Sequence, residues 1–486
     1  MKEAQQANIF QGVRVNNMVE DVALFQFADD AIFVGEWSLK NAKNLLRVLK
    51  CFEVCSGLKI NLNKSRLSGV TVTKEEVISM ARRLDCKEES IPFIYLGLPV
   101  GGNMKSAKNW QPLIDKFCAK LSSWKAKTLS FGGRCCLCKS VLGTLGTYMF
   151  SLYKAPKKVI NTLEGIRRRF LWGGTSETKK ICWAAWEKVI REKKCGGLGI
   201  GSLRALNLAL LTKWRWREKT EPNAMWIMIV KSCADSLRSS GLRSSTGGSW
   251  NTIRSVEKDL NEVGINVSTF LKPSGDGSSW VWELDSSNIY SVKSLRKLID
   301  GITLRLLKRK RSGSVGSPCK NNIHLWRVLS DKLPTRVNLT KRGVVLPSVD
   351  CPLCNIRPES LDHVMISCSI ALAIGAHLTN WVDWWPRRVQ SVTDFWDKIR
   401  RNGEKNANTE VRKIIGAAFF SMLWKLRNSK VFKGVVQSDL ETVREIQTTA
   451  YHWVRCRSKG GRLINWEDWI CNPANAVNLC TALAYR

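Results

Sequence analysis

Two carboxylates, Asp29 and Asp30, lie side by side between two short apolar runs near the start of the sequence. Residues 22–27 and 31–34 have the apolar pattern of strands, whereas Asp is disfavoured inside strands and common in tight turns. The pattern predicts a hairpin with both carboxylates at its tip. Adjacent carboxylates repel each other unless a divalent cation lies between them, which makes the tip a candidate Mg²⁺ site. An acidic turn that binds no metal is the alternative interpretation.

A carboxylate pair of this kind suits two-metal phosphoryl transfer. In that reaction Mg²⁺ ions activate an attacking hydroxyl and neutralise the leaving pyrophosphate. The chemistry needs a third carboxylate from a neighbouring strand, and the acids upstream of the pair are Glu3, Glu20 and Asp21. None of them lies in a separate strand-and-helix unit that would place it opposite the hairpin. We therefore expect the metal site to lack its third carboxylate.

A second set of residues has metal-ligand spacing. Cys351, Cys354, His363 and Cys368 follow the pattern C-x2-C-x8-H-x4-C. The two thiolates of a C-x2-C knuckle reach one Zn²⁺ from a tight turn, and a His and a Cys further along complete a tetrahedron. Because four protein ligands leave no open position, the predicted site is structural. Four unrelated side chains in a cysteine-rich protein are the alternative.

Two further motifs carry weaker signals. The glycines at 197, 199 and 201 resemble a phosphate-binding loop, but the Lys-Ser/Thr of a P-loop is missing, so a helix-to-helix turn is predicted. The thiols within residues 135–138 lie in an apolar stretch and are expected to be small buried side chains rather than metal ligands.

The elements around the acidic pair are predicted from periodicity. Apolar residues recur at helical spacing over residues 39–52, and Gly57 supplies a stop signal. Residues 58–62 alternate between apolar and polar, which predicts a half-buried strand returning toward the hairpin. Lys59 and Lys64 would then lie beside the carboxylates. They are either solvated or in contact with phosphate groups.

The rest of the chain changes character along its length. Residues 93–100 predict another strand and turn, and residues 110–226 predict helices with cationic faces. Residues 233–279 are rich in Ser and Gly, which predicts a flexible connection and a domain boundary near Ser279. Helices are expected again in the last third. The order of strands and helices predicts an α+β fold.

Composition limits the classes of function. The 486 residues are enough for about three domains. Lys and Arg number 77 against 41 Asp and Glu, a formal net charge of +36, which indicates a polyanionic partner such as RNA or DNA. The 21 Trp interleaved with these cations suit base stacking as well as core packing.

The cysteines and the apolar runs bear on location. The sequence has 17 Cys, an odd number, and no apolar signal segment at its start, so reduced thiols and a nuclear or cytoplasmic, non-secreted protein are expected. Since no apolar run approaches the roughly 18 residues that cross a bilayer, no membrane partner is expected.

These stretches together resemble the C-terminal part of a plant non-LTR (LINE-type) retrotransposon reverse transcriptase. The resemblance is carried in order by residues 27–30, residues 57–65, residues 95–99, residues 196–199, residues 282–294 and the Cys and His set. It covers roughly residues 20–385. It implies the C-terminal part of a palm over 1–105, a helical thumb or connector over 106–232, a flexible linker over 233–279, a zinc-binding domain over 280–385, and a helical region over 386–486.

The resemblance also implies an activity, RNA-directed DNA polymerisation by nucleotidyl transfer. Asp29 and Asp30 would be the catalytic Mg²⁺ ligands, and Lys59 and Lys64 would contact the incoming deoxynucleoside triphosphate. The segment Tyr95, Leu96 and Gly97 would steady the primer end, RNA and DNA would be the partners, and Zn²⁺ would be structural.

The sequence departs from the family pattern at its start. Family members carry an endonuclease, fingers and a first palm strand with another catalytic Asp, and no segment here resembles them. We therefore expect this chain alone to be inactive in synthesis. Two alternatives stay open, a catalytically silent zinc-containing nucleic-acid-binding protein and a product that does not fold fully.

Overall fold

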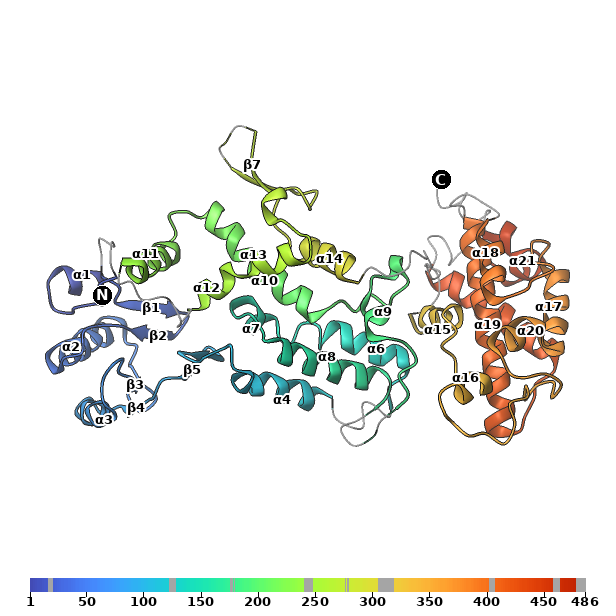
Figure 1. Ribbon diagram of the computed structural model, residues 1–486, viewed down its shortest axis with the longest axis horizontal. Coiled ribbons are helices and arrows are strands. Elements are labelled where there is room, and N and C mark those ends of the chain that lie inside the picture. The colour runs from blue at the N-terminus through green and yellow to red at the C-terminus, as the bar shows by residue number, and fades with distance from the viewer. Residues whose placement is uncertain are drawn as a thin grey trace. The chain divides into compact units, whose positions relative to one another are not determined.

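A computed structural model describes residues 1–15, 21–121, 128–174, 178, 180–239, 248–275, 277, 279–304, 319–401, 407–457 and 464–477 (Figure 1). The chain divides into two compact units. The first comprises residues 1–116, 146–162 and 203–302, and the second comprises residues 117–145, 163–202 and 303–486. Among the described residues, no helix is both long enough and apolar enough to span a membrane.

Each element is assigned to the unit that holds most of its residues. The first unit contains α1 (Lys2–Gln6), β1 (Leu24–Phe27), β2 (Asp30–Phe33), α2 (Leu39–Ser56), β3 (Arg66–Leu67), α3 (Lys74–Arg83), β4 (Lys87–Glu88), β5 (Phe93–Tyr95), β6 (Leu98–Val100), η1 (Ala107–Trp110), α4 (Gln111–Lys120), α7 (Thr147–Leu152), α10 (Leu203–Thr220), α11 (Met225–Ser239), α12 (Ser249–Arg254), α13 (Val256–Glu262), η3 (Val267–Thr269), β7 (Leu271–Pro273), β8 (Trp280–Trp282) and α14 (Val292–Thr303). The second contains α6 (Phe131–Ser140), α8 (Lys157–Leu171), α9 (Trp186–Ile190), η2 (Lys193–Cys195), α15 (Cys319–Leu329), α16 (Arg336–Thr340), the π-helical turn η4 (His363–Ser367), α17 (Ser369–Trp381), α18 (Val392–Arg401), α19 (Ala407–Lys433), α20 (Asp439–Arg457) and α21 (Trp466–Cys471).

The described strands pair only two at a time, so the fold is rich in helix with small separate sheets. This agrees with the predicted α+β class in its coarse form. The helical character expected for residues 110–226 and for the last third is present in their described parts.

The acidic pair lies on a hairpin, as predicted. β1 and β2 are antiparallel and Phe27 pairs with Asp30, so Ala28 and Asp29 form the two-residue turn. Ala28 adopts a left-handed φ of 52°, which is uncommon for a residue other than Gly. Its carbonyl oxygen accepts a hydrogen bond of 3.2 Å from the side-chain amide of Gln26.

The predicted helix after the hairpin is α2, and its ends have the expected caps. Ser38 accepts a hydrogen bond from the backbone N–H of Asn41, and Gly57 ends the helix with a left-handed φ of 73°. The side chain of Asn41 is buried and bonds both the N–H and the carbonyl of Gln11, at 2.9 Å each. Asn41 therefore attaches α2 to the segment that precedes the hairpin.

The strand predicted over residues 58–62 is wrong. Residues 57–61 have no regular structure, and Leu58 is 65% exposed. The Asn61 side chain accepts a hydrogen bond from the N–H of Lys64, so the segment folds into a local turn. The short strand β3 follows at Arg66 and pairs in parallel with β4. The alternation of apolar and polar residues did not suffice to predict a strand, because a strand also needs a neighbouring strand for its backbone hydrogen bonds.

Residues 93–100 form a complete hairpin rather than one strand and a turn. β5 and β6 are antiparallel, and Leu96 and Gly97 occupy the two-residue loop with φ values of 50° and 77°. Positive φ at both central residues is typical of the type I′ turns that connect tight hairpins.

Most of the predicted flexible linker is folded. Within residues 233–279, α12 contributes Ile253, α13 contributes Val256 and Leu260, and η3 contributes Val267 to a core that also contains Trp282 and Tyr290. β7 pairs with β8 from Pro273 to Trp280, so the predicted boundary near Ser279 falls inside a hairpin. The Ser and Gly content reflects turns between short elements here. Residues 240–247 lie outside the described part.

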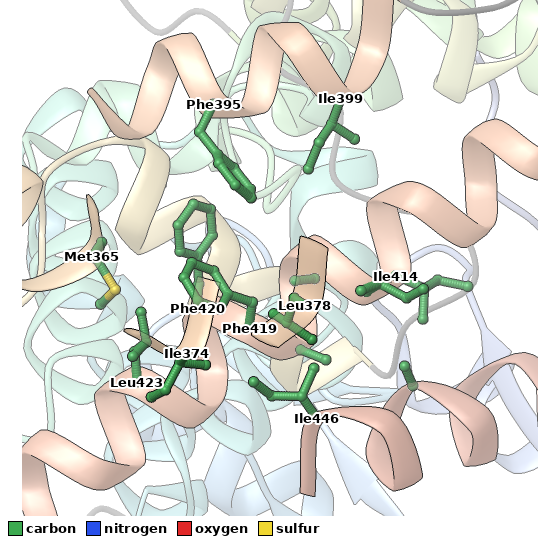
Figure 2. Packing of buried hydrophobic residues seen from close by; sticks show 14 of the residues in the cluster. Met365, Ile374, Leu378, Phe395, Ile399, Ile414, Phe419, Phe420, Leu423 and Ile446 are labelled. Carbon is green, nitrogen blue, oxygen red and sulfur yellow. The ribbon is translucent and has the colours of Figure 1, made fainter. Parts of the chain in front are cut away.

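Residues 325–477 of the second unit share one large apolar core. Residues of η4, α17, α18, α19 and α20 converge in it, as Figure 2 shows for Met365, Ile374, Phe395, Phe420 and Ile446. Residues on both sides of the predicted division at 385/386 contribute to this core.

Candidate metal centre

The four predicted zinc ligands lie together. The ligand atoms of Cys351, Cys354, His363 and Cys368 are all within 4.8 Å of one another. The Cys351 and Cys368 sulfurs are 4.0 Å apart, and the Cys354 sulfur is 3.2 Å from Nε2 of His363. Ligands of a tetrahedral zinc ion are about 3.5–3.8 Å apart, given metal bonds of about 2.0–2.3 Å. The donor set and its spacing therefore fit one Zn²⁺.

The first two cysteines lie on a tight turn. The Asn355 N–H donates to the Cys351 carbonyl at 2.8 Å, and Asn355 itself has a left-handed φ of 56°. Cys351 is fully buried, and the backbone N–H groups of Leu353 and Cys354 point at its sulfur. These donors favour a thiolate at this position, as a metal ligand requires.

The other two ligands lie at the junction of η4 and α17. The N–H of Cys368 donates to the His363 carbonyl at 2.7 Å, which closes the π-helical turn. Such turns are often found at functional sites. Cys368 is the N-cap of α17, and the backbone N–H groups of Ile370 and Ala371 act to lower the pKa of its thiol. Ser367 Oγ lies 3.3 Å from His363 Nδ1 and orients the ring, leaving Nε2 toward the sulfurs.

The surroundings shift the pKa values of these groups in different directions. The hydrogen bond from the Cys351 thiol lowers the pKa of Cys368, while that same bond and burial raise the pKa of Cys351. Burial, helped by nearby Arg357, lowers the pKa of His363 and keeps its ring neutral. A neutral imidazole and thiolates are the forms that bind zinc. Since all four positions are filled by the protein, the site can hold a structural ion and has no place for a substrate.

A buried ion pair between Glu359 and Arg427 connects the segment after the two cysteines to α19. Glu359 is fully buried, and its carboxylate accepts bonds of 2.5 and 2.8 Å from Arg427 on α19. The N–H of Arg336 donates to the same carboxylate at 2.7 Å. Sequence reasoning missed this pair, because 68 residues separate its members and neither lies in a recognisable motif.

A second polar contact ties the ligand segment to the helices. The Asp362 carboxylate, next to the ligand His363, accepts a 2.8 Å bond from the N–H of Val392 at the start of α18. The metal-ligand segment is therefore anchored to both α18 and α19.

The acidic hairpin is open to solvent. Asp29 and Asp30 are both exposed, and within the described ranges they belong to no group of three potential metal ligands. Asp21 forms a 3.1 Å ion pair with Arg14, Glu3 is exposed on α1, and Glu20 lies outside the described residues. The hairpin presents two carboxylates, enough for one Mg²⁺ that keeps several waters, whereas a two-metal site needs a further ligand.

The other predicted contact residues remain predictions. Lys59 and Lys64 are exposed. Tyr95 begins the tight hairpin loop and Leu96 and Gly97 form it, with the first two half-buried and the glycine exposed.

The glycine-rich loop has a packing role. A Cβ on Gly197 would lie 2.2 Å from the Arg191 carbonyl oxygen, and Trp326 donates a 2.8 Å bond to the Gly196 carbonyl. The loop connects η2 to α10 and lines a cavity of about 110 Å³ beside α15. This agrees with the predicted helix-to-helix turn. Cys135 and Cys138 are buried as expected, whereas Cys136 is exposed.

The comparison with known families bears directly on the metal centre. Residues 290–374 match a family described as zinc-binding in reverse transcriptase. All four clustered ligands lie inside the matched stretch.

Two relatives from Arabidopsis thaliana are similar to parts of this chain. One, named as a candidate ribonuclease H protein, is 35% identical over 153 residues, which is 31% of this chain and 25% of the relative. The other, an uncharacterized mitochondrial protein, is 30% identical over 89 residues, 18% of this chain and 58% of the relative. The matches thus span a quarter and somewhat over half of these relatives. Together with the family match, they support a reverse transcriptase-related protein with a structural zinc site.

Proposed function

We propose that this chain is part of a plant LINE-type retroelement reverse transcriptase and that it binds RNA and DNA. The observation that carries the proposal is the closed Cys351, Cys354, His363 and Cys368 cluster inside the stretch that matches a reverse transcriptase zinc-binding family. The net charge of +36 supports a polyanionic partner. In this proposal zinc holds the second unit in shape and takes no part in chemistry.

Binding is tested by the salt dependence of affinity. Labelled RNA and DNA oligonucleotides are titrated with the full chain at several salt concentrations. Because phosphate contacts release condensed counterions, we expect a linear fall of log affinity with log salt. Affinity that is absent, or that does not respond to salt, would contradict the proposal.

The polymerase role is the finer part of the proposal. Asp29 and Asp30 would hold Mg²⁺, which supplies charge neutralisation at the phosphates, while Lys59 and Lys64 contact the triphosphate and Tyr95, Leu96 and Gly97 contact the primer end. The described residues place no third carboxylate beside the hairpin. We therefore propose nucleotide binding with weak or absent copying by this chain alone.

Primer extension on an RNA template with Mg²⁺ separates this role from the second candidate, a catalytically silent zinc-containing nucleic-acid-binding protein. Exposure of the acidic pair without a third ligand favours the silent candidate. Asp29→Asn is compared with Asp85→Asn, an exposed acid on a different loop. Product that disappears only with Asp29→Asn would establish a polymerase, and nucleic-acid binding without product would establish the silent protein.

A further inference from the structure

The first unit carries two cationic depressions that share the short helix α12. The first, here the lysine groove, is lined by Lys105, Lys154, Ala155, Pro156, Lys157, Asn251, Thr252 and Ser255. The second, here the basin, is lined by Arg215, Glu218, Lys219, Lys231, Arg254 and Glu257. We propose that both depressions contact the phosphodiester backbone of one nucleic-acid strand, independently of base sequence. This inference rests on the proposed nucleic-acid binding and names its surface.

The lysine groove has more lysines than ion pairs. Its lining includes three lysines and no carboxylate, in a depression of about 390 Å³. Lys154 is held by Asp259 at 2.5 Å and by the Ser255 hydroxyl at 3.2 Å. Lys105 and Lys157 have no ion pair within the described residues. Two cations are therefore available for an anion, beside hydroxyl and amide groups that can also bond phosphate oxygens.

The backbone of the groove is fixed from below. Asn207 on α10 is buried, and its side-chain amide donates to the carbonyls of Phe150 and Tyr153 at 2.8 and 2.9 Å. Its carbonyl oxygen accepts from the N–H of Ala155 at 2.9 Å. These three side-chain hydrogen bonds of Asn207 hold the backbone on both sides of Lys154. The backbone position of Lys154 is therefore fixed before a ligand binds.

The basin is an ordered charge network with an excess of cations. Arg215 Nε bonds Glu257 at 2.7 Å, and both Arg215 and Arg254 pair with Glu218, the second at 3.5 Å. The two glutamates thus orient the two arginines. Lys219 and Lys231 then add two positive charges, in a depression of about 500 Å³.

α12 links the two depressions into one surface. It supplies Asn251 and Thr252 to the groove and Arg254 to the basin, and it packs beside α10 and α13 (Figure 1). Its Ile253 is buried and belongs to the apolar core of this unit. Charges on both sides of one packed helix suit a chain of repeating negative groups better than a single small anion.

The tryptophans of this region argue for backbone contact rather than base stacking. Trp226 packs edge-on against Trp214 at 5.1 Å and against Trp250 at 5.6 Å. Arg217 covers the rings of Trp214 and Trp226 at 4.9 and 5.4 Å. Because these rings already pack against one another and against Arg217, we expect the surface to contact phosphates through its cations and not to stack on bases.

Two paired variants of the full chain test the surface. Lys105→Gln with Lys157→Gln removes two lysine charges of the groove, and Lys219→Gln with Lys231→Gln removes the two lysine charges of the basin, where Lys219 Nζ lies 4.8 Å from the centre of the Trp280 ring. The control, Lys293→Gln with Lys297→Gln, removes the same charge from two exposed positions one turn apart on α14. Fluorescence anisotropy with labelled single-stranded RNA and duplex DNA of mixed sequence gives affinity as a function of salt.

Each test pair should lower the slope of log affinity against log salt by about 1.5, since each lost phosphate contact contributes roughly 0.7–0.9. Affinity at low salt should fall on the order of ten-fold for every sequence tried, while the control changes the slope by far less. Test pairs that behave like the control overturn the inference. So does polyglutamate that competes as well as RNA at equal charge, since it would indicate an acidic protein partner. Failure of the unmodified chain to bind RNA or DNA would instead refute the proposed function.

Discussion

Cys368 combines two roles at one position. It is the N-cap of α17 and a member of the four-residue cluster, and the backbone N–H groups of Ile370 and Ala371 at the helix start act to lower the pKa of its thiol. Helix N-termini favour negative charge, and a thiolate there is stabilised before a metal binds. The ligand and the helix start are thus one structural feature, which ties occupancy of the site to the order of α17.

Loss of one ligand should remove the metal. We expect about one Zn²⁺ per purified chain, measured by elemental analysis, and its loss in Cys351→Ser together with a large fall in the free energy of unfolding. Cys456→Ser changes an exposed thiol on α20 and should keep both the metal and the stability. Equal zinc content in the two variants would rule out the four-ligand site.

A partly buried histidine gives the chain a defined pH dependence. Burial lowers the pKa of His324 to about 4 from an unperturbed value of 6.5, and its Nε2 lies 3.4 Å from the Phe420 carbonyl. Between these two pH values the unfolded chain binds more protons than the folded chain, so stability falls as pH falls from 6.5 toward 4. The loss should reach up to about 3 kcal/mol.

Denaturant unfolding at pH 7 and pH 5 measures the part of that loss above pH 5, about 2 kcal/mol. His324→Gln should lose less stability than the unmodified chain over this interval. His377→Gln, at an exposed position in the same unit, should behave like the unmodified chain. Identical pH profiles for the two variants would show that His324 is not the responsible group.

At the level of elements, the zinc knuckle depends on α19 through one ion pair. Arg427 and Glu359 are both buried and share two hydrogen bonds. Arg427→Met leaves a buried carboxylate without its charge partner and should cost about 3–5 kcal/mol in the free energy of unfolding. Lys425 lies on the same helix as Arg427 and forms a largely exposed ion pair with Glu445. Lys425→Met removes this pair and should cost less than about 1 kcal/mol in the free energy of unfolding.

Adding Glu359→Gln to Arg427→Met tests the reason for that cost. Gln still accepts the N–H of Arg336 but carries no charge, so the double variant should recover part of the stability. Costs that simply add would mean that packing, rather than the uncompensated charge, accounts for the effect.

At the level of the whole molecule, the two units have separate apolar cores. One contains Trp282, Tyr290 and Leu295, and the other contains the cluster of Figure 2 around Phe420 and Ile446. The metal ligands belong to the second. Zinc removal should therefore loosen one core and leave the other intact.

Hydrogen exchange with and without a zinc chelator checks this at peptide resolution. Peptides from α17 and α19 should lose protection when zinc is removed, whereas peptides from α10 and α13 should keep theirs. Uniform loss across both units would show that the chain unfolds as one cooperative body.

Several features follow from the sequence alone. The Ser38 and Gly57 caps define α2, and the apolar runs around Asp29 define the hairpin, because these patterns act over a few neighbouring residues. The C-x2-C-x8-H-x4-C spacing predicted the zinc ligands, because the four residues lie close together in the sequence and only a few residue types bind zinc.

Tertiary structure decided the rest. The alternating residues 58–62 have no strand to pair with, and the Ser- and Gly-rich stretch folds because Ile253 and Leu260 find a core supplied by distant segments. The Glu359–Arg427 pair and the cationic surface around α12 likewise join residues far apart in sequence. Local pattern carries no information on such partners, because burial and pairing depend on what the rest of the chain brings alongside.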